Sequence, residues 1–579
     1  MQESAPHQSL ESGEYGRNND TQFQKDPGLL KEMFYGLDSI AMRGSRVYGW
    51  GWLFHENTSV SAMRLVIKTR HEMHYFPCQY GLLRQDVSNT YAFDAAKNSG
   101  FVIQGRLPQE KLIDIFLEVD LSEGGTRRLD CEELQRLLSS SEQRTIGMNQ
   151  KGLRKIYRYG RQVVSGLARG DLRGLYYKTQ RKIEHVRLDG RAIAFSLGEF
   201  MNSIGPNKHQ DFALIIDHNM GGGTNLYRTK LIEEQLEIGR AVVVLTYDVW
   251  RLRYALKFHD RERDLLFHME SLDSLNSLVE TVRIREIFLN NTVSFDDPLM
   301  IVTLLLHIKK ATGAELTIAV HDYFAICPSW TLIDDRGLYC GVPSIARCRE
   351  CLPTMRGALS FWVDNEDIDQ WREVWGRCLV EANRILCFSR SSIDLLARAY
   401  PHLESSKITF RPHTIDEFPK TKVRLSMNGP LHIGIVGEIS IAKGAQIVRE
   451  MNRLILERGL PIKMTVIGTI EGVSESTIVH ITGPYKREEL PTIIEKTGAH
   501  VFFVPAIWPE TFSYVTAELM QMGLAVASFN LGAQAERLGT YHRGLIIEDT
   551  TSEAALDQLI AFHAKLVRSQ REEFQIQAS

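Results

Sequence analysis

The stretch that decides the fold is VFFVPAIWPETFSYVTAELMQMGLAVASFN, residues 501–530. It opens with the unbroken apolar run VFFV, whose length and β-branched character are typical of a fully buried parallel strand. Pro505 ends this strand, and Thr511 is expected to cap a helix that ends at Gly523. The apolar residues of that helix recur at three- and four-residue steps. The run LAVAS follows as the next strand, so the stretch forms one strand–helix–strand unit.

Two carboxylates frame this unit. Glu510 lies at the mouth of the helix, and Glu518 follows about two helical turns later. Ligands of open α/β sheets bind outside the carboxyl ends of the strands, and carboxylates accept hydrogen bonds from neighbouring hydroxyl groups. The alternative is a pair of helix-surface glutamates, with Glu510 merely favourable to the helix dipole.

The Glu-x7-Glu spacing, after an apolar strand and before a helix that ends in glycine, resembles the signature of GT-B glycosyltransferases of family 4. The resemblance implies that Glu510 contacts the transferred sugar and that Glu518 hydrogen-bonds the ribose of a nucleotide. It also adds Thr511 and Phe512 to the expected donor-binding residues. The fold implied is α/β, with two Rossmann-like domains that face a cleft.

The bulk composition is that of a large soluble globular protein. At 579 residues the chain is too long for one core, and 44% of its residues are hydrophobic and 24% charged. The net charge of -3 gives no reason to expect nucleic acid as a partner. Eight cysteines in so long a chain do not make a disulfide scaffold, and no secretory signal is evident. We expect a cytoplasmic protein, with the inner face of the cell membrane as one possible place.

The N-terminal third is expected to hold three segments ahead of the α/β part. Residues 1–36 are polar and predict a flexible tail, and the short alternating strands of residues 37–125 predict a small β-sandwich. This segment loosely resembles the β-sandwich modules fused ahead of some bacterial glycosyltransferases. Trp50 and Trp52 suit either a sandwich core or stacking on a sugar ring, which leaves a glycan-binding role open.

Residues 126–205 predict a basic helical linker. Between Lys151 and Arg187 there are eleven Lys or Arg residues against two acidic residues, interleaved with apolar ones. Such a segment is either a solvated linker or a surface that lies peripherally on an anionic membrane.

The first α/β domain is expected over residues 206–425, where strands such as FALIID, AVVVLTY and ELTIAVHDY alternate with helices. A glycine-rich loop follows its first strand, and glycines there let backbone N–H groups approach phosphate oxygens. By resemblance this loop lies near the donor diphosphate and the acceptor. The residues expected in it are His218, Gly221, Gly222 and Gly223.

His321 ends the fourth strand beside Asp322, and the resemblance implies that His321 touches the transferred sugar. Four cysteines lie in the segment that follows, Cys327, Cys340, Cys348 and Cys351. Four thiolates suffice for a structural zinc site, whereas ordinary buried thiols are the alternative. No catalytic metal is expected.

The second α/β domain is expected over residues 426–570. Its segment GEISIAKG resembles the donor loop of the family, which implies that Gly437 and Lys443 contact the donor diphosphate. A lysine there stabilises the charge of a leaving pyrophosphoryl group. Glu438 departs from the arginine common in the family. Gly483 opens a segment that, by resemblance, flanks the nucleotide base.

Together these features predict a retaining glycosyltransferase, hexosyl or deoxyhexosyl, in bacterial cell-surface polysaccharide synthesis (O-antigen, capsule or exopolysaccharide). The implied donor is a UDP-, GDP- or dTDP-linked sugar, and the implied acceptor is a glycan or a lipid-linked glycan. Two alternatives stay open: a non-catalytic glycan- or nucleotide-binding protein, which Glu438 motivates, and a GT-B epimerase or hydrolase that needs no acceptor.

Overall fold

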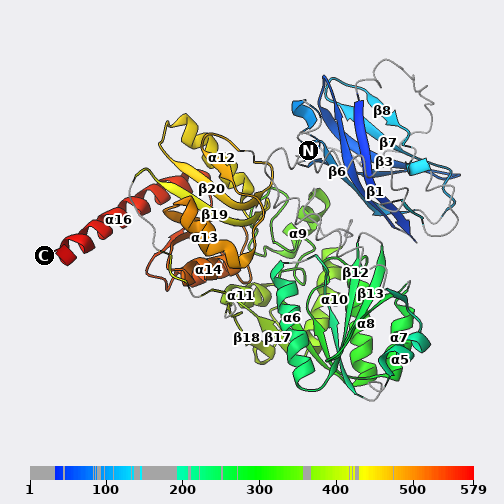
Figure 1. Cartoon of the computed structure of the whole chain (residues 1–579). Coiled ribbons are helices and arrows are strands. Elements are labelled where there is room, and N and C mark those ends of the chain that lie inside the picture. Colours follow the sequence, from blue (N-terminus) through cyan, green and yellow to red (C-terminus); the bar gives the residue numbers. More distant parts are fainter. Residues whose placement is uncertain are drawn as a thin grey trace, which may run out of the picture.

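The computed structural model describes residues 33–146 and 192–578, apart from gaps at 44–45, 83, 85–86, 88–90, 92, 97, 108–109, 132, 136–143, 206–209, 221, 250–251, 270, 356–366, 416–417, 420, 424–428 and 474. The described residues form an N-terminal β-sandwich and two α/β domains, which occupy separate parts of the molecule in Figure 1. The tail expected over residues 1–36 lies outside the described residues except for its last four positions.

The β-sandwich consists of two antiparallel sheets with the strand orders β5-β6-β2-β1-β9 and β4-β3-β7-β8. Alternate side chains of both sheets, among them Val47, Leu53, Leu65, Ile67 and Leu117, are buried between them. The strands are β1 (Met33–Arg43), β2 (Arg46–His55), β3 (Val60–Lys68), β4 (Met73–Pro77), β5 (Gln79–Leu82), β6 (Gly100–Arg106), β7 (Asp114–Leu121), β8 (Thr126–Leu129) and β9 (Arg144–Ile146).

The start of the expected linker is part of this sandwich. Strand β8 pairs with β7 through a turn at Gly124 and Gly125, whose positive φ angles of 96° and 92° suit glycine. Arg128 of β8 forms an ion pair with Asp114 at 2.8 Å. This arginine, which was expected in a basic helical linker, therefore lies on a sheet. Residues 147–191, with the basic stretch, lie outside the described residues.

The aromatic residues of β2 line the outer face of the first sheet. Trp52 is 9% exposed and packs with Phe54 and Tyr91 under the segment that follows β5. Trp50 is half-buried, lies 6.0 Å from Tyr48 (between ring centroids), and packs against the core of the first α/β domain. Both tryptophans are thus occupied by packing.

The first α/β domain contains a mixed sheet in the order β10-β14-β13-β12-β11-β15-β16-β17-β18. The predicted strands are present and parallel, and an antiparallel hairpin, β13 and β14, extends the sheet beyond them. The strands are β10 (Ile193–Ala194), β11 (Asp211–Ile216), β12 (Ala241–Asp248), β13 (Arg253–His259), β14 (Asp264–Met269), β15 (Arg283–Leu289), β16 (Glu315–Val320), β17 (Arg384–Cys387) and β18 (Ile408–Phe410).

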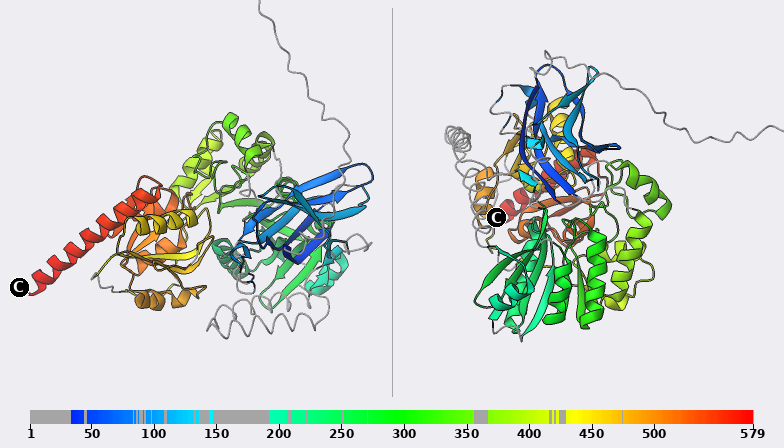
Figure 2. Two further views of the ribbon diagram at one scale, coloured as in Figure 1. Left: turned by 90° about the horizontal axis from the view of Figure 1, so that it is seen from above. Right: turned by 90° about the vertical axis from the view of Figure 1, so that its right-hand side faces the viewer.

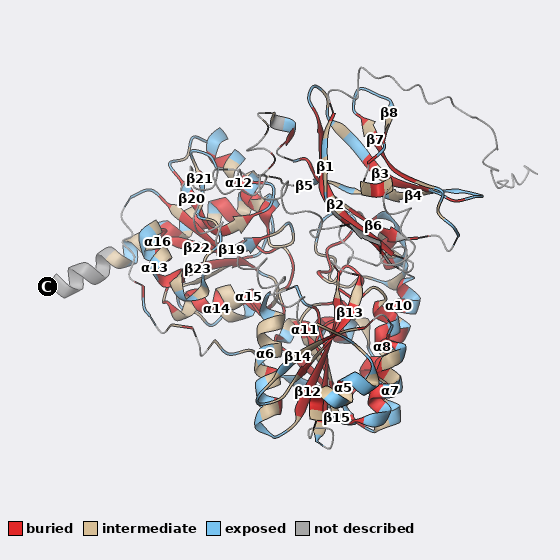
Figure 3. Cartoon of the chain, turned by 45° about the vertical axis from the view of Figure 1, so that its right-hand side comes forward, coloured by how far each residue is buried: buried red, intermediate tan, exposed pale blue. Residues whose placement is uncertain are grey.

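Helices cover both faces of this sheet. In β11, Phe212, Leu214 and Ile216 face the main core, whereas Ala213 and Ile215 face helix α6. Figure 3 shows these strands as a buried layer between helices whose outer sides are exposed. The helices are α5 (Leu197–Ile204), α6 (Gly222–Glu237), α7 (Asp273–Thr281), α8 (Pro298–Thr312), α9 (Ile345–Cys351), α10 (Ile368–Glu381) and α11 (Arg390–Ala399), with short 3-10 turns η4 (Leu352–Thr354) and η5 (Ser405–Lys407).

The second α/β domain has an entirely parallel sheet in the order β21-β20-β19-β22-β23-β24. Numbered from its own first strand, this is the order 3-2-1-4-5-6 of a Rossmann sheet. The elements are β19 (His432–Ile439), α12 (Ala445–Glu457), β20 (Lys463–Ile470), β21 (Val479–Ile481), η6 (Arg487–Glu489), α13 (Leu490–Thr497), β22 (Val501–Val504), α14 (Tyr514–Gln521), β23 (Ala525–Phe529), α15 (Gly532–Leu538), β24 (Gly544–Ile547) and α16 (Ser552–Ala578).

The strand–helix–strand unit is present with one correction. All four residues of β22 are buried, with Val501 and Phe503 facing one core and Phe502 facing the other. The expected helix cap at Thr511 is wrong: α14 begins after Ser513, and the Thr511 hydroxyl binds elsewhere. The last helix, α16, leads away from the domain, as the left view of Figure 2 shows. None of the described helices has the length and apolar character needed to cross a membrane.

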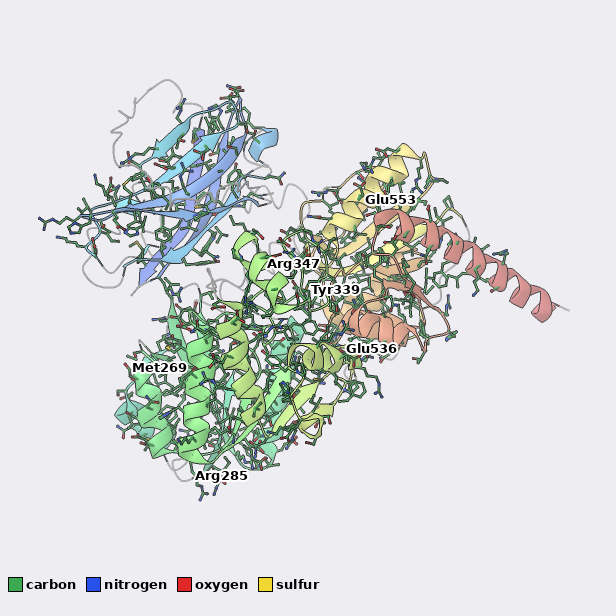
Figure 4. All side chains as sticks on the ribbon, turned by 180° about the vertical axis from the view of Figure 1, so that it is seen from behind. Met269, Arg285, Tyr339, Arg347, Glu536 and Glu553 are labelled. Carbon is green, nitrogen blue, oxygen red and sulfur yellow. The ribbon has the colours of Figure 1, made fainter. Side chains whose placement is uncertain are left out.

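The two α/β domains are in direct contact. The carboxylate of Glu536 on α15, labelled in Figure 4, accepts hydrogen bonds from two backbone N–H groups at the start of α11. The donors are Arg390, at 2.9 Å, and Ser391, at 2.7 Å. Trp508, from the loop after β22, packs edge-on against Tyr323 of the first domain, with 6.3 Å between ring centroids. The carboxyl ends of the two sheets are therefore held on facing sides of one junction.

Candidate active site

The switch point of the Rossmann sheet brings two loops together. Strands β19 and β22 are neighbours, and the strands that follow them in the chain, β20 and β23, lie on opposite sides of this pair, which is where such sheets bind ligands. The backbone N–H of Ile507, after β22, donates to the carbonyl of Ala442, after β19, at 3.0 Å. Gly444 has φ of 90°, and a Cβ atom there would lie 2.0 Å from the carbonyl oxygen of Pro505. Only glycine permits this close approach.

These two loops carry the predicted Lys443 and Glu510. Both side chains are half-buried. In the part of the chain that the structure describes, neither the ammonium group of Lys443 nor the carboxylate of Glu510 has a hydrogen-bond or ion-pair partner. A half-buried cation and anion without partners at a switch point are available to a ligand, the cation to phosphate and the anion to hydroxyl groups.

Glu518 lies deeper and has a partner. Glu518 is buried, and its carboxylate accepts a hydrogen bond from Nε of Arg487 at 2.5 Å. Burial raises the pKa of this carboxyl above its ordinary value, whereas Arg487 lowers it. Burial likewise raises the pKa of the neighbouring Tyr485. Sequence reasoning missed Arg487, which is 31 residues away along the chain.

The predicted glycines lie at the carboxyl ends of neighbouring strands. Gly437 of β19 has φ of 121°, and a Cβ atom there would lie 3.8 Å from Val515 of α14. Its neighbour Gly468 on β20 could not carry a Cβ, which would meet the carbonyl oxygen of Gly437 at 2.1 Å. Gly483, with φ of 79°, follows β21. Glu438, in place of the arginine common in the family, is exposed.

In the first α/β domain the strand ends converge on His321. Nε2 of His321 lies 2.8 Å from Oδ1 of Asn290, which follows β15. The amide of Asn290 also hydrogen-bonds the carboxyl of Asp217, which follows β11. Asn290 and Asp217 were not singled out from the sequence, although both lie at the ends of predicted strands.

Burial and nearby cations set the protonation of this cluster. Burial lowers the pKa of His321 well below its usual range, with His413 and His218 adding to the effect. Burial lowers the pKa of His218 to about 4 and raises the pKa of Asp217 to about 7, opposed in the latter case by Arg228 at 3.0 Å. At neutral pH the two histidines are therefore uncharged hydrogen-bonding groups.

The ring of His321 belongs to an aromatic cluster at the junction of the two domains. It stacks on Phe388, 4.7 Å between centroids, and Tyr227 contacts it edge-on at 5.0 Å. The rings of Phe512 and Tyr514, from the second domain, reach the same cluster through His413. Phe512, predicted to bind the donor, is thus used in domain packing.

The glycine-rich loop lies against the second domain. Gly221 is outside the described residues, and Gly222 begins α6 with φ of 80°. A Cβ atom on Gly223 would lie 2.7 Å from the ring of Tyr514. The structure therefore brings Gly223, His321 and the start of α14 into one junction.

The four cysteines of the predicted zinc site lie in one insert after β16. All four are free thiols, and Cys327, Cys340 and Cys351 are only partly buried. Among the described residues, no three His, Cys, Asp or Glu side chains are arranged to hold a metal ion. As placed, the thiols do not fit a zinc centre, so the site stays a prediction.

Two Rossmann-like α/β domains with facing strand ends define the GT-B architecture, and the fold expected from the sequence is confirmed. Residues 419–576 match the model of the family Glycosyl transferases group 1. The chain thus has the GT-B architecture, and its second α/β domain matches the model of that family. No curated protein matches the sequence.

Several solved structures are distantly similar. Sucrose-phosphate synthase from Thermosynechococcus elongatus is 14% identical, with a TM-score of 0.39 over 64% of this chain and 100% of that chain. HepE from Anabaena, in complex with UDP and glucose, is 14% identical, with a TM-score of 0.39 over 63% of this chain and 95% of that chain. WaaG, a glycosyltransferase involved in lipopolysaccharide biosynthesis, is 11% identical, with a TM-score of 0.37 over 61% and 90%. Likenesses this distant do not bear on the substrates of this chain.

Proposed function

We propose that the protein is a retaining glycosyltransferase that moves a hexosyl or deoxyhexosyl group from a nucleotide-sugar to a glycan or lipid-linked glycan. The observation that carries the proposal is the switch point of the second α/β domain, where Lys443 and Glu510 lie on touching loops and their charged groups have no partner among the described residues. The family match over residues 419–576 supports glycosyl transfer as the class of reaction.

The donor occupies the second domain in this proposal. Lys443 pairs with the diphosphate and stabilises the charge that develops on the leaving nucleotide. Gly437 and Gly483 allow close approach of backbone N–H groups at the strand ends. Glu518 accepts hydrogen bonds from the ribose hydroxyls, and Glu510 accepts them from the sugar that is transferred.

The first domain completes the site. His321, held neutral by burial, hydrogen-bonds the sugar from the opposite side of the junction. The loop around Gly222 and Gly223 lies beside the phosphates and the acceptor. Orientation of the acceptor and electrostatic stabilisation of the leaving group are the catalytic contributions, with no step assigned to a metal.

We place the reaction in the synthesis of cell-surface polysaccharide in the cytoplasm, at the inner face of the membrane when the acceptor is lipid-linked. The test is turnover by the full-length protein with UDP-, GDP- and dTDP-sugars, measured as released nucleotide with and without glycan acceptors. Release that depends on an acceptor supports a transferase. Release without an acceptor indicates a hydrolase, and binding without release indicates a non-catalytic protein.

A further inference from the structure

Among the described residues of the second α/β domain, the ion pair between Arg487 and Glu518 is the most deeply buried. The side chain of Glu518 is 4% exposed and that of Arg487 is 33% exposed. Arg487 belongs to the short turn η6, whereas Glu518 lies on helix α14. A pair drawn from two separate elements fixes those elements relative to each other.

Aromatic rings hold the guanidinium group of Arg487 in place. Its central carbon lies 5.5 Å from the ring centroid of Phe418 and 5.7 Å from that of Tyr514. The planar guanidinium can contact rings with its face while it donates hydrogen bonds from its edge in a fixed geometry. The contact to Glu518 uses Nε and reaches Oε1 only.

The second carboxylate oxygen, Oε2, has no hydrogen-bond partner among the described residues. An ionised carboxylate has about four lone-pair sites, so Oε2 can accept hydrogen bonds from two neighbouring hydroxyl groups. Without a cation beside it, the pKa of a buried carboxyl rises, and its protonated form loses much of this capacity.

We propose that Arg487 is a positioning residue for the donor nucleotide: it holds Glu518 by one carboxylate oxygen and keeps the other oxygen free for the ribose hydroxyls. The inference rests on the proposed function, because it needs a nucleotide at Glu518. In this proposal Arg487 acts on nucleotide binding through Glu518, to which its Nε donates a hydrogen bond.

The proposal predicts a pH dependence that a purely structural role would not produce. Two titratable groups act on Glu518 or respond to it, Arg487 and Tyr485. Burial raises the pKa of the Glu518 carboxyl and Arg487 lowers it, so loss of Arg487 raises this pKa further. Nucleotide affinity should then fall as the pH falls through the raised value, because the protonated carboxyl accepts fewer hydrogen bonds.

The experiment measures dissociation constants of UDP, GDP and dTDP by calorimetry between pH 6 and pH 8. For the nucleotide that binds most tightly, Arg487→Met should raise the dissociation constant about tenfold or more at pH 7. Below the raised pKa of the Glu518 carboxyl, the dissociation constant should rise by up to about tenfold more for each pH unit. Arg487→Lys, which keeps the charge, should flatten the pH profile again. In the double variant Arg487→Met, Glu518→Gln, the added pH dependence should disappear, because the amide does not titrate.

The matched control is Arg458→Met. Arg458 pairs with Asp557 at 2.6 Å on the outer side of the same domain, where no donor is placed. The nucleotide dissociation constants of the Arg458→Met variant should match those of the wild type at every pH. If Arg487→Met does not fold, Arg487→Gln replaces it in the same pH series, since it also removes the charge.

Two results would overturn the inference. Unchanged affinity and pH profile in the folded Arg487→Met protein would show that Glu518 does not depend on Arg487. Tighter binding in that variant would show that Arg487 occupies the place of the ribose and competes with it. If the wild-type protein binds none of the three nucleotides, the proposed function fails instead, and this outcome is distinct from the other two.

Discussion

The hydroxyl group of Thr511, in the second α/β domain, donates a hydrogen bond to the backbone carbonyl of His321, in the first, at 2.8 Å. One residue of the expected donor loop thus holds the strand end that carries the expected sugar-binding histidine. Thr511 is 5% exposed, so this bond is shielded from water. Because this hydrogen bond joins the two domains, the position of His321 depends on how closely they are held together.

Thr511→Val tests this coupling, because it keeps the shape of the side chain and removes the donor. A lost hydrogen bond of this kind costs about 1 kcal/mol, so turnover should fall about fivefold while nucleotide affinity stays unchanged. The control is Thr516→Val, which removes a 2.9 Å bond to Ser513 within one domain. Equal losses of turnover in both variants would contradict a special role for the bond between domains.

Gly223 is predicted to be intolerant of alanine. The added Cβ would lie 2.7 Å from the ring of Tyr514, so the ring must move or the domains must separate. Overpacking of this kind costs about 1–3 kcal/mol, which unfolding experiments and turnover should both register. In a Tyr514→Ala background, which removes the ring, the added Gly223→Ala change should cost little further. Gly198→Ala in α5, where no atom lies within 4 Å, is the control and should be neutral or stabilising.

Trp50 is predicted to act in domain packing. Trp50→Ala should lower the free energy of unfolding by about 2 kcal/mol, because the half-buried ring leaves a gap against the first α/β domain. The acceptor KM should not change. A rise in acceptor KM without loss of stability would restore the glycan-stacking role for this tryptophan.

Stability should fall in acid partly through His413. Burial lowers the pKa of His413 to about 3, and Arg537, Lys230 and Arg411 add to the effect. The unfolded chain binds a proton at a pKa near 6.5, so the folded state loses relative stability as the pH falls from about 6.5 towards 3. This one residue contributes about 2 kcal/mol between pH 7 and pH 5.

His413→Phe keeps an aromatic ring beside Phe388, 3.9 Å away between centroids, and removes the titration. The variant should lose less stability than the wild type between pH 7 and pH 5, measured by urea unfolding. Comparison of the two proteins cancels the opposite effect of Asp217, whose pKa is raised to about 7. Parallel pH profiles would contradict the assignment.

Local patterns predicted much of the α/β fold. The run VFFV is apolar at every position because β22 is buried on both faces, and Gly523 ends α14 with φ of 78°. The hairpin of β13 and β14 was missed because its turn contains no glycine. The carboxylate of Asp260 instead accepts hydrogen bonds from the backbone N–H groups of Glu262 and Arg263. A turn stabilised in this way by a side chain has no strong sequence signal.

Pairings between distant residues could not be predicted in the same way. Thr511 has the residue type and place of a helix cap, yet its hydroxyl binds His321, 190 residues away. Arg487 sits in a charged stretch in which nothing marks it as the partner of Glu518. Trp50 and Trp52 share one face of β2, and only the packing of domains decides what covers that face.

The central claim is that Lys443 and Glu510 serve glycosyl transfer, and acceptor-dependent release of nucleotide tests it most directly. Wild type, Lys443→Ala and Glu510→Ala should be compared with the same nucleotide-sugar and glycan acceptor. The account predicts release by the wild type only when acceptor is present, with losses of about a hundredfold or more in both variants and little change in folding. Release that needs no acceptor, or equal release by all three proteins, would contradict it.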